Sequence, residues 1–365
     1  MNILILSWRG SGHPLAGGAE QVTFEHAKGW LKAGNKVTLF TSYYIGANID
    51  ENKGGIRIIR RGDQFFGVKL AAFKWYWFEN REKFDLIVDE FHGLPFFTPL
   101  WAIGVKKLGF IHEVAQKVWK LNPWPWPYNK IAAFFGKMGE PWIFKLFYKY
   151  IPFMTVSKST ESDLKAWGIK NITVIPNGVL LPNILPNLPK EKDFTMIYLS
   201  ALAKDKGIED AIATFNIVKK EIPSLKFWIV GKSYPEYTNY LKGLCPDARF
   251  WGFVTDQKKY ELLTRAYVLI FPSVHEGWGL VIIEAASVGT PTVAYKVSGV
   301  KDAIVNRKTG LMAGKEMPEE LVKLILELYK NKKLYLKLSK NAKEWSKRFS
   351  WEKSIKESTS LINKI

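Results

Sequence analysis

The sequence contains one cysteine among its 365 residues, Cys245, so an internal disulfide and a multi-cysteine metal site are both excluded. It contains no uninterrupted apolar run of about 18 residues, the length that a membrane-spanning helix requires. Its first residues, MNILILSW, lack the basic segment that opens a signal peptide. We therefore expect a protein of a reducing compartment, the cytoplasm, that does not span a membrane.

Acidic residues are few relative to basic ones. Lys and Arg number 53 against 34 Asp and Glu, which gives a formal net charge of +19 and a pI near 9.6. Such a surface attracts anions, whether nucleic acid, anionic lipid or phosphorylated substrates. Only nine of the 53 are arginine, the residue that base and bidentate phosphate recognition prefer, and no nucleic-acid-binding motif accompanies the charge. We expect a solvated, lysine-rich surface and no nucleic-acid partner.

The length exceeds what one hydrophobic core usually supports, which indicates two domains. Short apolar runs alternate with helical patterns, and this alternation predicts parallel sheets. The runs lie at 2–7, 36–41, 56–59, 84–89, 108–111, 153–156 and 172–175, and then at 195–200, 225–231, 248–253, 267–273 and 290–295. A proline-rich stretch at 175–194 indicates a linker between the two series. The predicted fold class is α/β, with two Rossmann-like, doubly wound parallel-sheet domains that face each other across a ligand-binding cleft.

One stretch in the second series, HEGWGLVIIEAASVGTPTVA at 275–294, predicts a phosphate site. It follows a predicted strand, and its helix is expected to begin near Gly279 or Leu280. The first turn of such a helix presents unpaired amides and the positive end of the helix dipole. Gly277 and Gly279 permit close approach of the backbone to a ligand.

Two glutamates flank this predicted phosphate site. Glu284 lies one helical turn beyond Leu280, at a distance suited to a ribose, whereas Glu276 lies in the loop on the other side. Carboxylates beside a phosphate repel it unless they accept hydrogen bonds from hydroxyl groups. The pair therefore favours a sugar nucleotide; the alternative is that both are ordinary solvated charges.

The pattern E-G-[FW]-G-L-x-x-x-E-A-x-x-x-G-x-P in this stretch resembles the signature of the retaining glycosyltransferases of family 4, which have the GT-B fold. Three further stretches resemble that family, at 16–42 (AGGAEQVTFEHAKGWLKAGNKVTLFTS), 155–179 (TVSKSTESDLKAWGIKNITVIPNGV) and 349–354 (FSWEKS). The resemblance covers nearly the whole chain. It implies an N-terminal, acceptor-side domain at 1–180, a C-terminal, donor-side domain at 181–348, and a final helix at 349–365 that crosses back to the N-terminal domain.

The resemblance also implies site residues. The amides of Gly17 and Gly18 are expected to face the distal phosphate of the donor, His112 to contact the transferred sugar, and Lys206 to neutralise the leaving diphosphate. The implied catalytic residues are His112, Glu276 and Lys206, and the implied donor-binding residues are Gly17, Gly18, Lys206, Gly277, Gly279, Leu280 and Glu284.

Two departures from the family pattern stand near these residues. Ala201 occupies the place of the usual arginine that shares the diphosphate, and Arg9, Lys204 and Lys232 are the candidates to replace it. The segment VSGVKD at 297–302 replaces a glycine pair followed by proline and glutamate. The missing arginine motivates an alternative reading, in which the chain is a catalytically weakened homologue that binds a sugar nucleotide or acts as a partner subunit.

A nicotinamide-dependent enzyme is a competing interpretation, because GSGHPLA at 10–16 follows the first predicted strand and matches a loose dinucleotide-binding pattern. Pro14 and the glycine pair at 17–18 stand where the helix of that motif should already run. The strand at 36–41 also ends without an acid to hold an adenosine ribose. We therefore favour the glycosyltransferase.

For the family, the resemblance implies transfer from a nucleotide-diphosphate sugar to a glycan or lipid-linked acceptor by front-face attack, in which a leaving phosphate oxygen takes the acceptor proton. That mechanism implies no separate general base, and the absence of a second carboxylate pair like that of a glycosidase agrees with it. We also expect no metal and no cofactor besides the donor, because no cluster of His, Asp or Glu has metal-ligand spacing.

The segment at 117–153 is dense in tryptophan, phenylalanine and tyrosine between lysines. This composition suits the interface of an anionic membrane, where rings lie at head-group depth. The alternative is a helical hairpin that buries these rings in the N-terminal domain. The first possibility predicts peripheral contact with the cytoplasmic face of a membrane and a lipid-linked acceptor.

Overall fold

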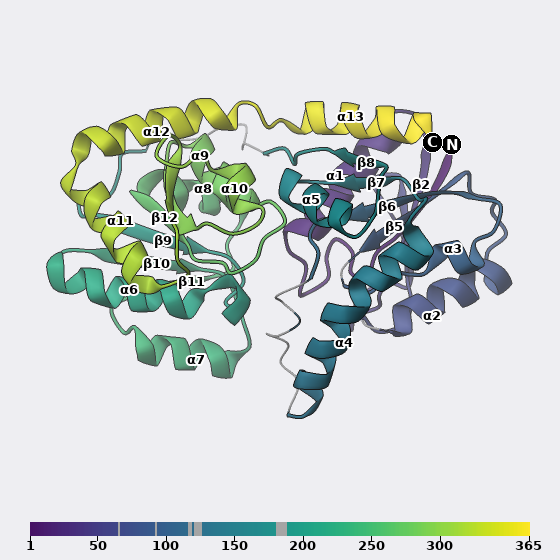
Figure 1. The fold of residues 1–365 in the computed structure, drawn as a ribbon, viewed down its shortest axis with the longest axis horizontal. Coiled ribbons are helices and arrows are strands. Elements are labelled where there is room, and N and C mark those ends of the chain that lie inside the picture. The colour runs from purple at the N-terminus through teal and green to yellow at the C-terminus, as the bar shows by residue number, and fades with distance from the viewer. Residues whose placement is uncertain (65, 92, 116–118, 120–125, 180–187) are drawn as a thin grey trace. The chain divides into compact units, whose positions relative to one another are not determined.

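The protein, described by a computed structural model, forms two compact units (Figure 1). Unit 1 comprises Met1–Gly178 and Trp351–Ile365, and unit 2 comprises Val179–Ser350. The structure describes residues 1–64, 66–91, 93–115, 119, 126–179 and 188–365. The sequence placed the two divisions at 180/181 and 348/349. No helix among the described residues is both long and apolar enough to cross a lipid bilayer.

Unit 1 contains an eight-stranded sheet with the order β3-β4-β2-β1-β5-β6-β7-β8. Its strands are β1 (Asn2–Leu6), β2 (Lys36–Thr41), β3 (Asp50–Lys53), β4 (Ile56–Arg60), β5 (Leu86–Phe91), β6 (Lys106–Ile111), β7 (Phe153–Thr155) and β8 (Ile172–Val174). All neighbours pair in parallel except β3, which runs antiparallel to β4. The apolar runs predicted the parallel strands, but β3, with the sequence DENK, has no apolar residue and so gave no signal.

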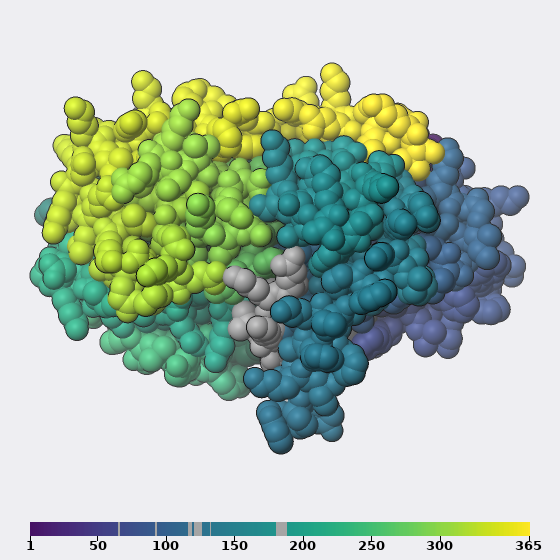
Figure 2. Space-filling model, viewed as in Figure 1, coloured from purple at the N-terminus to yellow at the C-terminus, as the bar shows by residue number. Residues whose placement is uncertain are grey.

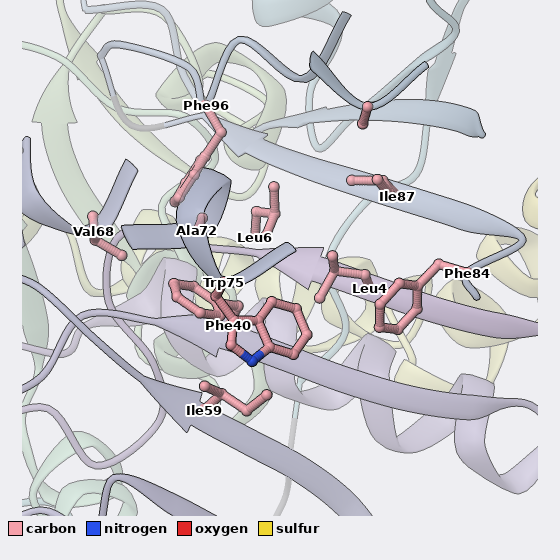
Figure 3. Packing of buried hydrophobic residues seen from close by; sticks show 11 residues of the cluster. Leu4, Leu6, Phe40, Ile59, Val68, Ala72, Trp75, Phe84, Ile87 and Phe96 are labelled. Carbon is pink, nitrogen blue, oxygen red and sulfur yellow. The ribbon is translucent and has the colours of Figure 1, made fainter. Parts of the chain in front are cut away.

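The helices of unit 1 cover this sheet (Figure 1). They are α1 (Gly18–Lys32), α2 (Gly67–Lys74) with the π-helical turn η1 (Trp75–Glu79), α3 (Thr98–Trp101), α4 (Tyr128–Ile143) with the π-helical turn η3 (Phe144–Tyr148), α5 (Lys158–Ala166) and α13 (Trp351–Lys364). Figure 3 shows one part of the core, where Trp75 of η1 packs beside Phe40 of β2 with ring centroids 5.3 Å apart. The buried cluster around this pair includes residues of β1, β2, β4 and β5.

Unit 2 contains a six-stranded, all-parallel sheet with the order β11-β10-β9-β12-β13-β14. Its strands are β9 (Thr195–Leu199), β10 (Lys226–Val230), β11 (Arg249–Gly252), β12 (Val268–Phe271), β13 (Thr292–Tyr295) and β14 (Gly310–Ala313). Its helices are the 3-10 turn η4 (Lys204–Lys206), α6 (Ile208–Glu221), α7 (Pro235–Leu244), α8 (Asp256–Arg265), α9 (Leu280–Ser287), α10 (Val300–Ala303), α11 (Pro318–Lys330) and α12 (Lys332–Ser346). Because strand order reverses beside β9, the carboxyl ends of β9 and β12 border a topological switch point, where open α/β sheets bind ligands.

The last helix, α13, packs against α1 within unit 1. Ser358 of α13 lies between two α1 side chains: its Oγ accepts a hydrogen bond from Trp30 Nε1 at 3.0 Å and lies 2.9 Å from His26 Nδ1. The side chain of Ile355 packs against Gly29 of α1, where a Cβ would lie 2.2 Å from Ile355 Cγ2. Burial lowers the pKa of His26 to about 3, so this side chain is neutral at ordinary pH.

Ser358→Ala is expected to lower the free energy of unfolding of unit 1 by about 1–3 kcal/mol, because Trp30 Nε1 and His26 Nδ1 lose their shared partner while they remain buried. Urea denaturation followed by tryptophan fluorescence measures this loss. Ser354→Ala is the matched control, since Ser354 is a buried serine of the same helix whose Oγ has no hydrogen-bond partner among the described residues. Equal effects of the two substitutions would contradict the role of Ser358.

Candidate functional site

The loop between β12 and α9 holds the sequence motif of unit 2. Helix α9 begins at Leu280, as the sequence predicted, and Gly279 before it adopts a left-handed conformation with φ +79°. That conformation favours glycine, because a side chain there is strained. The amides of Leu280 and Val281 have no partner in the helix ladder, whereas Ile282 N–H donates to the carbonyl oxygen of Gly279 at 2.9 Å. This end of the helix is therefore suited to an anion.

Lys206 of η4 and Glu276 of this loop form an ion pair. Lys206 Nζ donates to Glu276 Oε1 at 2.9 Å, and the two side chains are 22% and 13% exposed. A phosphate oxygen bound to this ammonium group would therefore lie next to the Glu276 carboxylate. The structure thus brings together two of the residues that the resemblance implied as catalytic.

Two backbone features hold Lys206 beside the end of β12. Gly207 has φ +70°, and a Cβ there would lie 2.0 Å from the carbonyl oxygen of Pro272, so only glycine allows the contact. The hydroxyl of the fully buried Tyr198 lies 2.9 Å from the carbonyl oxygen of Ala201 and 3.2 Å from that of Lys206. These contacts fix the turn between β9 and α6, and with it the position of the lysine.

Gly299 supports the same loop from behind. It has φ +74°, and a Cβ there would lie 2.3 Å from the carbonyl oxygen of Glu276. Gly299 belongs to the VSGVKD segment that departs from the family pattern, so the departure retains a glycine at the contact. The sequence showed this glycine but not its function, because a glycine alone does not reveal which backbone it touches.

Glu284 of α9 is buried and is paired with a lysine that the sequence analysis missed. Lys259 Nζ of α8 donates to Glu284 Oε1 at 2.6 Å and lies 3.0 Å from Asp256 Oδ1. Burial alone would lower the pKa of Lys259, but the charge of Glu284 and its hydrogen bond raise that pKa above its ordinary value. One oxygen of Glu284 is thus engaged, and a ribose would have to use the other or displace the lysine.

In unit 1, His112 follows β6 and is held by a buried carboxylate. His112 Nε2 lies 3.1 Å from Glu90 Oε1, and the same oxygen accepts a hydrogen bond from Thr23 Oγ1 at 2.7 Å. Glu90 stands on β5 and Thr23 on α1, so one carboxylate joins three elements at the carboxyl edge of the sheet. The sequence analysis named His112 but not Glu90, although a glutamate directly after the apolar run at 84–89 was the available signal.

The glycine pair before α1 has one amide already engaged. The N–H of Gly17 donates to Glu20 Oε2 at 2.7 Å, and the other oxygen of this buried carboxylate accepts from Arg9 Nε at 2.8 Å. Gly18 occupies the first position of α1, and its amide has no partner in the helix ladder. Of the two amides expected to face a phosphate, that of Gly17 is therefore bonded to Glu20, whereas that of Gly18 lies at the start of the helix and does not make this contact.

The three candidates for the missing arginine differ in their contacts. Arg9 is bonded to Glu20 and to the carbonyl oxygen of Leu15, and Lys232 lies over the ring of Phe253 at 4.6 Å. The side chain of Lys204 is exposed and makes no hydrogen bond or ion pair in the described part of the chain, although its carbonyl oxygen accepts from the N–H of Gly207 at 3.0 Å. Since Lys204 shares the η4 turn with Lys206, it is the candidate nearest in sequence to the ion pair.

Two doubly wound parallel α/β units, with a strand–loop–helix turn at the carboxyl edge of the second, define the GT-B class of fold. A family model for Glycosyltransferase Family 4 matches residues 16–181, and one for Glycosyl transferases group 1 matches residues 183–345. The chain belongs to this family of glycosyltransferases.

Individual relatives agree with this assignment. A 221-residue stretch is 28% identical to an uncharacterised glycosyltransferase of Methanocaldococcus jannaschii and covers 58% of this chain and 60% of that relative, which is less than two thirds of its length. The fold is similar to that of sucrose-phosphate synthase from Thermosynechococcus elongatus, with a TM-score of 0.80 and 21% identity over 100% of this chain and 98% of the other. An Anabaena protein solved in complex with UDP-glucose matches with a TM-score of 0.72 and 16% identity over 100% of both chains. At these identities the structural likeness shows the fold alone.

Lys259→Met is expected to destabilise unit 2 by about 3 kcal/mol, because it leaves the Glu284 carboxylate buried without its cation. The double variant Lys259→Met/Glu284→Gln should recover most of that loss, since the buried charge is then gone. Urea denaturation at pH 7 compares the variants. Lys258→Met is the control: its partner Glu261 is 28% exposed and the pair is worth less than about 1 kcal/mol. Equal losses at Lys258 and Lys259 would refute the buried pair.

Proposed function

We propose that the protein transfers a sugar from a nucleotide-diphosphate donor to a glycan or lipid-linked acceptor, with retention of anomeric configuration and without a metal ion. The observation that carries the proposal is the Lys206–Glu276 pair, 2.9 Å apart, next to the amino end of α9. A cation, a helix end and a carboxylate in one place suit a phosphate that is joined to a sugar.

The chemistry of the leaving group explains why these residue types are needed. Negative charge builds on the distal phosphate as the glycosidic bond breaks, and a fixed cation lowers the barrier by stabilising that charge. In this proposal Lys206 and the amides at the start of α9 provide that stabilisation, in place of a divalent metal. Glu276 accepts hydrogen bonds from the hydroxyls of the transferred sugar, and Glu284 accepts one from the ribose.

Retention follows from front-face attack in the proposal. The acceptor hydroxyl approaches the side from which the diphosphate departs, and a phosphate oxygen takes its proton, so no further general base is required. His112 contacts the transferred sugar, and Glu90 orients the imidazole through the contact at Nε2. The structure of the Anabaena protein in complex with UDP-glucose supports a nucleotide-sugar donor for a chain of this fold.

The proposed setting is the cytoplasm, with peripheral contact to the cytoplasmic face of an anionic membrane. The net charge of +19 favours such contact. A lipid-linked sugar would then be presented to the enzyme at the membrane surface.

Donor hydrolysis tests the catalytic assignment. With a panel of UDP- and GDP-sugars, the protein should slowly release free nucleotide diphosphate from its own donor in the absence of acceptor. Glu276→Gln is expected to lower this release at least about tenfold, because the amide replaces one of the two carboxylate oxygens that accept hydrogen bonds from the sugar hydroxyls and leaves the other uncharged. Glu344→Gln, on an exposed glutamate of α12, serves as control. Unchanged release by Glu276→Gln would refute its role, and no release from any donor would favour the weakened homologue.

Ala201→Arg is expected to tighten binding of the free nucleotide diphosphate about tenfold, the value of one charge-assisted hydrogen bond. Isothermal titration calorimetry measures the change, and Ala201→Met controls for added bulk without charge. Lys204→Met is measured in parallel. If Ala201→Arg brings no gain while Lys204→Met weakens binding, Lys204 already fills the place of the arginine.

A further inference from the structure

Helix α4 of unit 1 has its apolar face turned outward. Its large apolar residues recur at helical spacing on one side, and each is about half to two-thirds exposed: Tyr128 63%, Ile131 49%, Phe134 63%, Phe135 67%, Met138 54% and Trp142 67%. We call these six residues the outer face of α4. An ordinary surface helix directs such a stripe toward the core. Of the two interpretations of 117–153, the one in which α4 buries its rings in the domain is therefore wrong for these residues.

The opposite side of α4 explains why the helix is held in this orientation. Glu140 is buried and accepts hydrogen bonds from the backbone of Ala115 at 2.9 Å and from Trp119 Nε1 at 3.1 Å. Gly136 leaves room for the Trp119 ring, since a Cβ there would lie 2.2 Å from Trp119 Cδ2. A rotation of α4 that buried its outer face would break these contacts and expose a buried carboxylate.

The end of α4 is also anchored to the sheet. The buried Tyr148, in the η3 turn that follows α4, donates to Asp89 Oδ2 at 2.6 Å, and Asp89 stands on β5. Phe144 packs in the same core cluster. In Figures 1 and 2, α4 extends from this base beyond the rest of unit 1.

Charge around the outer face has one sign. Between residues 128 and 150 the only acidic residue is Glu140, which is buried, whereas Lys130, Lys137 and Lys145 are exposed. The ammonium group of Lys145 lies 5.8 Å from the centre of the Trp142 ring. An apolar stripe flanked by lysines is complementary to the boundary between acyl chains and anionic head groups.

We propose that the outer face of α4 inserts into the head-group region of an anionic lipid bilayer. The inference deepens the proposed peripheral location and rests on it, because it names the surface that makes the contact. The aromatic and apolar side chains enter the boundary with the acyl chains, and Lys130, Lys137 and Lys145 contact lipid phosphates. The helix lies along the membrane surface and does not cross it.

The same contacts link the docking helix to the acceptor side of the site. Ala115, which donates to Glu140 of α4, lies three positions after His112. The loop that leaves β6 is thus held at its first residue, His112, by Glu90, and three residues later, at Ala115, by Glu140 of α4. A docked α4 holds His112 at a set distance from the membrane surface, which favours an acceptor sugar carried on a lipid.

Vesicle flotation tests the docking surface with phosphatidylcholine vesicles that contain or lack phosphatidylglycerol. The protein should float with the anionic vesicles and bind neutral vesicles at least about tenfold more weakly, since each lysine near an anionic surface changes binding several-fold. Phe135→Ser/Trp142→Ser should lower binding to anionic vesicles at least about tenfold, because two rings no longer enter the interface.

Two control variants separate the outer face of α4 from general properties of the surface. Tyr240→Ser/Leu336→Ser removes two apolar side chains of unit 2 that are 52% and 56% exposed, and it should bind like the unchanged protein. Two further variants each replace a pair of exposed lysines that lie seven positions apart on one helix: Lys130→Glu/Lys137→Glu on α4 and Lys333→Glu/Lys340→Glu on α12. Each variant lowers the net charge by four, from +19 to +15. Only the first of these two variants should lose binding to about the level of neutral vesicles.

Equal losses for the two lysine pairs would overturn the proposal, because binding would then follow total charge. Failure of the unchanged protein to float would also overturn it. If the protein instead self-associates in sedimentation velocity, and Phe135→Ser/Trp142→Ser abolishes that association without vesicle binding, the outer face of α4 binds a second copy of this chain. Donor hydrolysis in solution is measured on the same variants: its retention in Phe135→Ser/Trp142→Ser separates loss of docking from failure of the proposed transfer chemistry.

Discussion

The ion pair between Lys206 and Glu276 is the constraint on which the candidate site of unit 2 depends. Its two partners lie 70 positions apart in the sequence and come from different loops at the carboxyl edge of one sheet. Two left-handed glycines make the approach of those loops possible: Gly207 touches the end of β12, and Gly299 touches the peptide of Glu276. A side chain at either position would push one loop away and separate the cation from the carboxylate. The electrostatics of the site are therefore determined by backbone packing.

Buried carboxylates fix the other functional elements in the same physical way. Glu90 joins α1, β5 and the residue after β6, and Glu140 joins α4 to the loop that follows His112. Glu284 is neutralised by Lys259. A buried charge without partners is costly, so each of these groups restricts its surroundings to arrangements in which its donors stay in place. In both units, a buried carboxylate with hydrogen-bond or ionic partners holds neighbouring elements together, either near the carboxyl end of a strand or on a helix.

The sequence predicted most of the fold, because its parallel strands are apolar runs and its site loop carries a specific pattern. It also predicted that a helix begins near Gly279 or Leu280, and α9 begins at Leu280. It missed the strand β3, whose four residues are all polar, and the short strand β14, where no run was predicted. It also missed the partner of Glu284, because Lys259 lies on another helix and no spacing links the two. The engagement of the Gly17 amide by Glu20 was equally hidden, since it depends on the rotamer of one side chain. Such contacts are tertiary facts that a one-dimensional pattern does not contain.

The aromatic segment at 117–153 is a second case in which the sequence pattern does not determine the tertiary arrangement. Composition alone left two readings of 117–153 open, because a ring that packs in a core and a ring that lies in a membrane interface are the same residue type. Helical periodicity could not decide between them, since an apolar stripe looks alike whether it faces inward or outward. The orientation is decided by Glu140 and Gly136 on the opposite side of α4, where a carboxylate needs donors and a ring needs space. Polar and small residues, not the apolar ones, therefore determine which way the apolar face points.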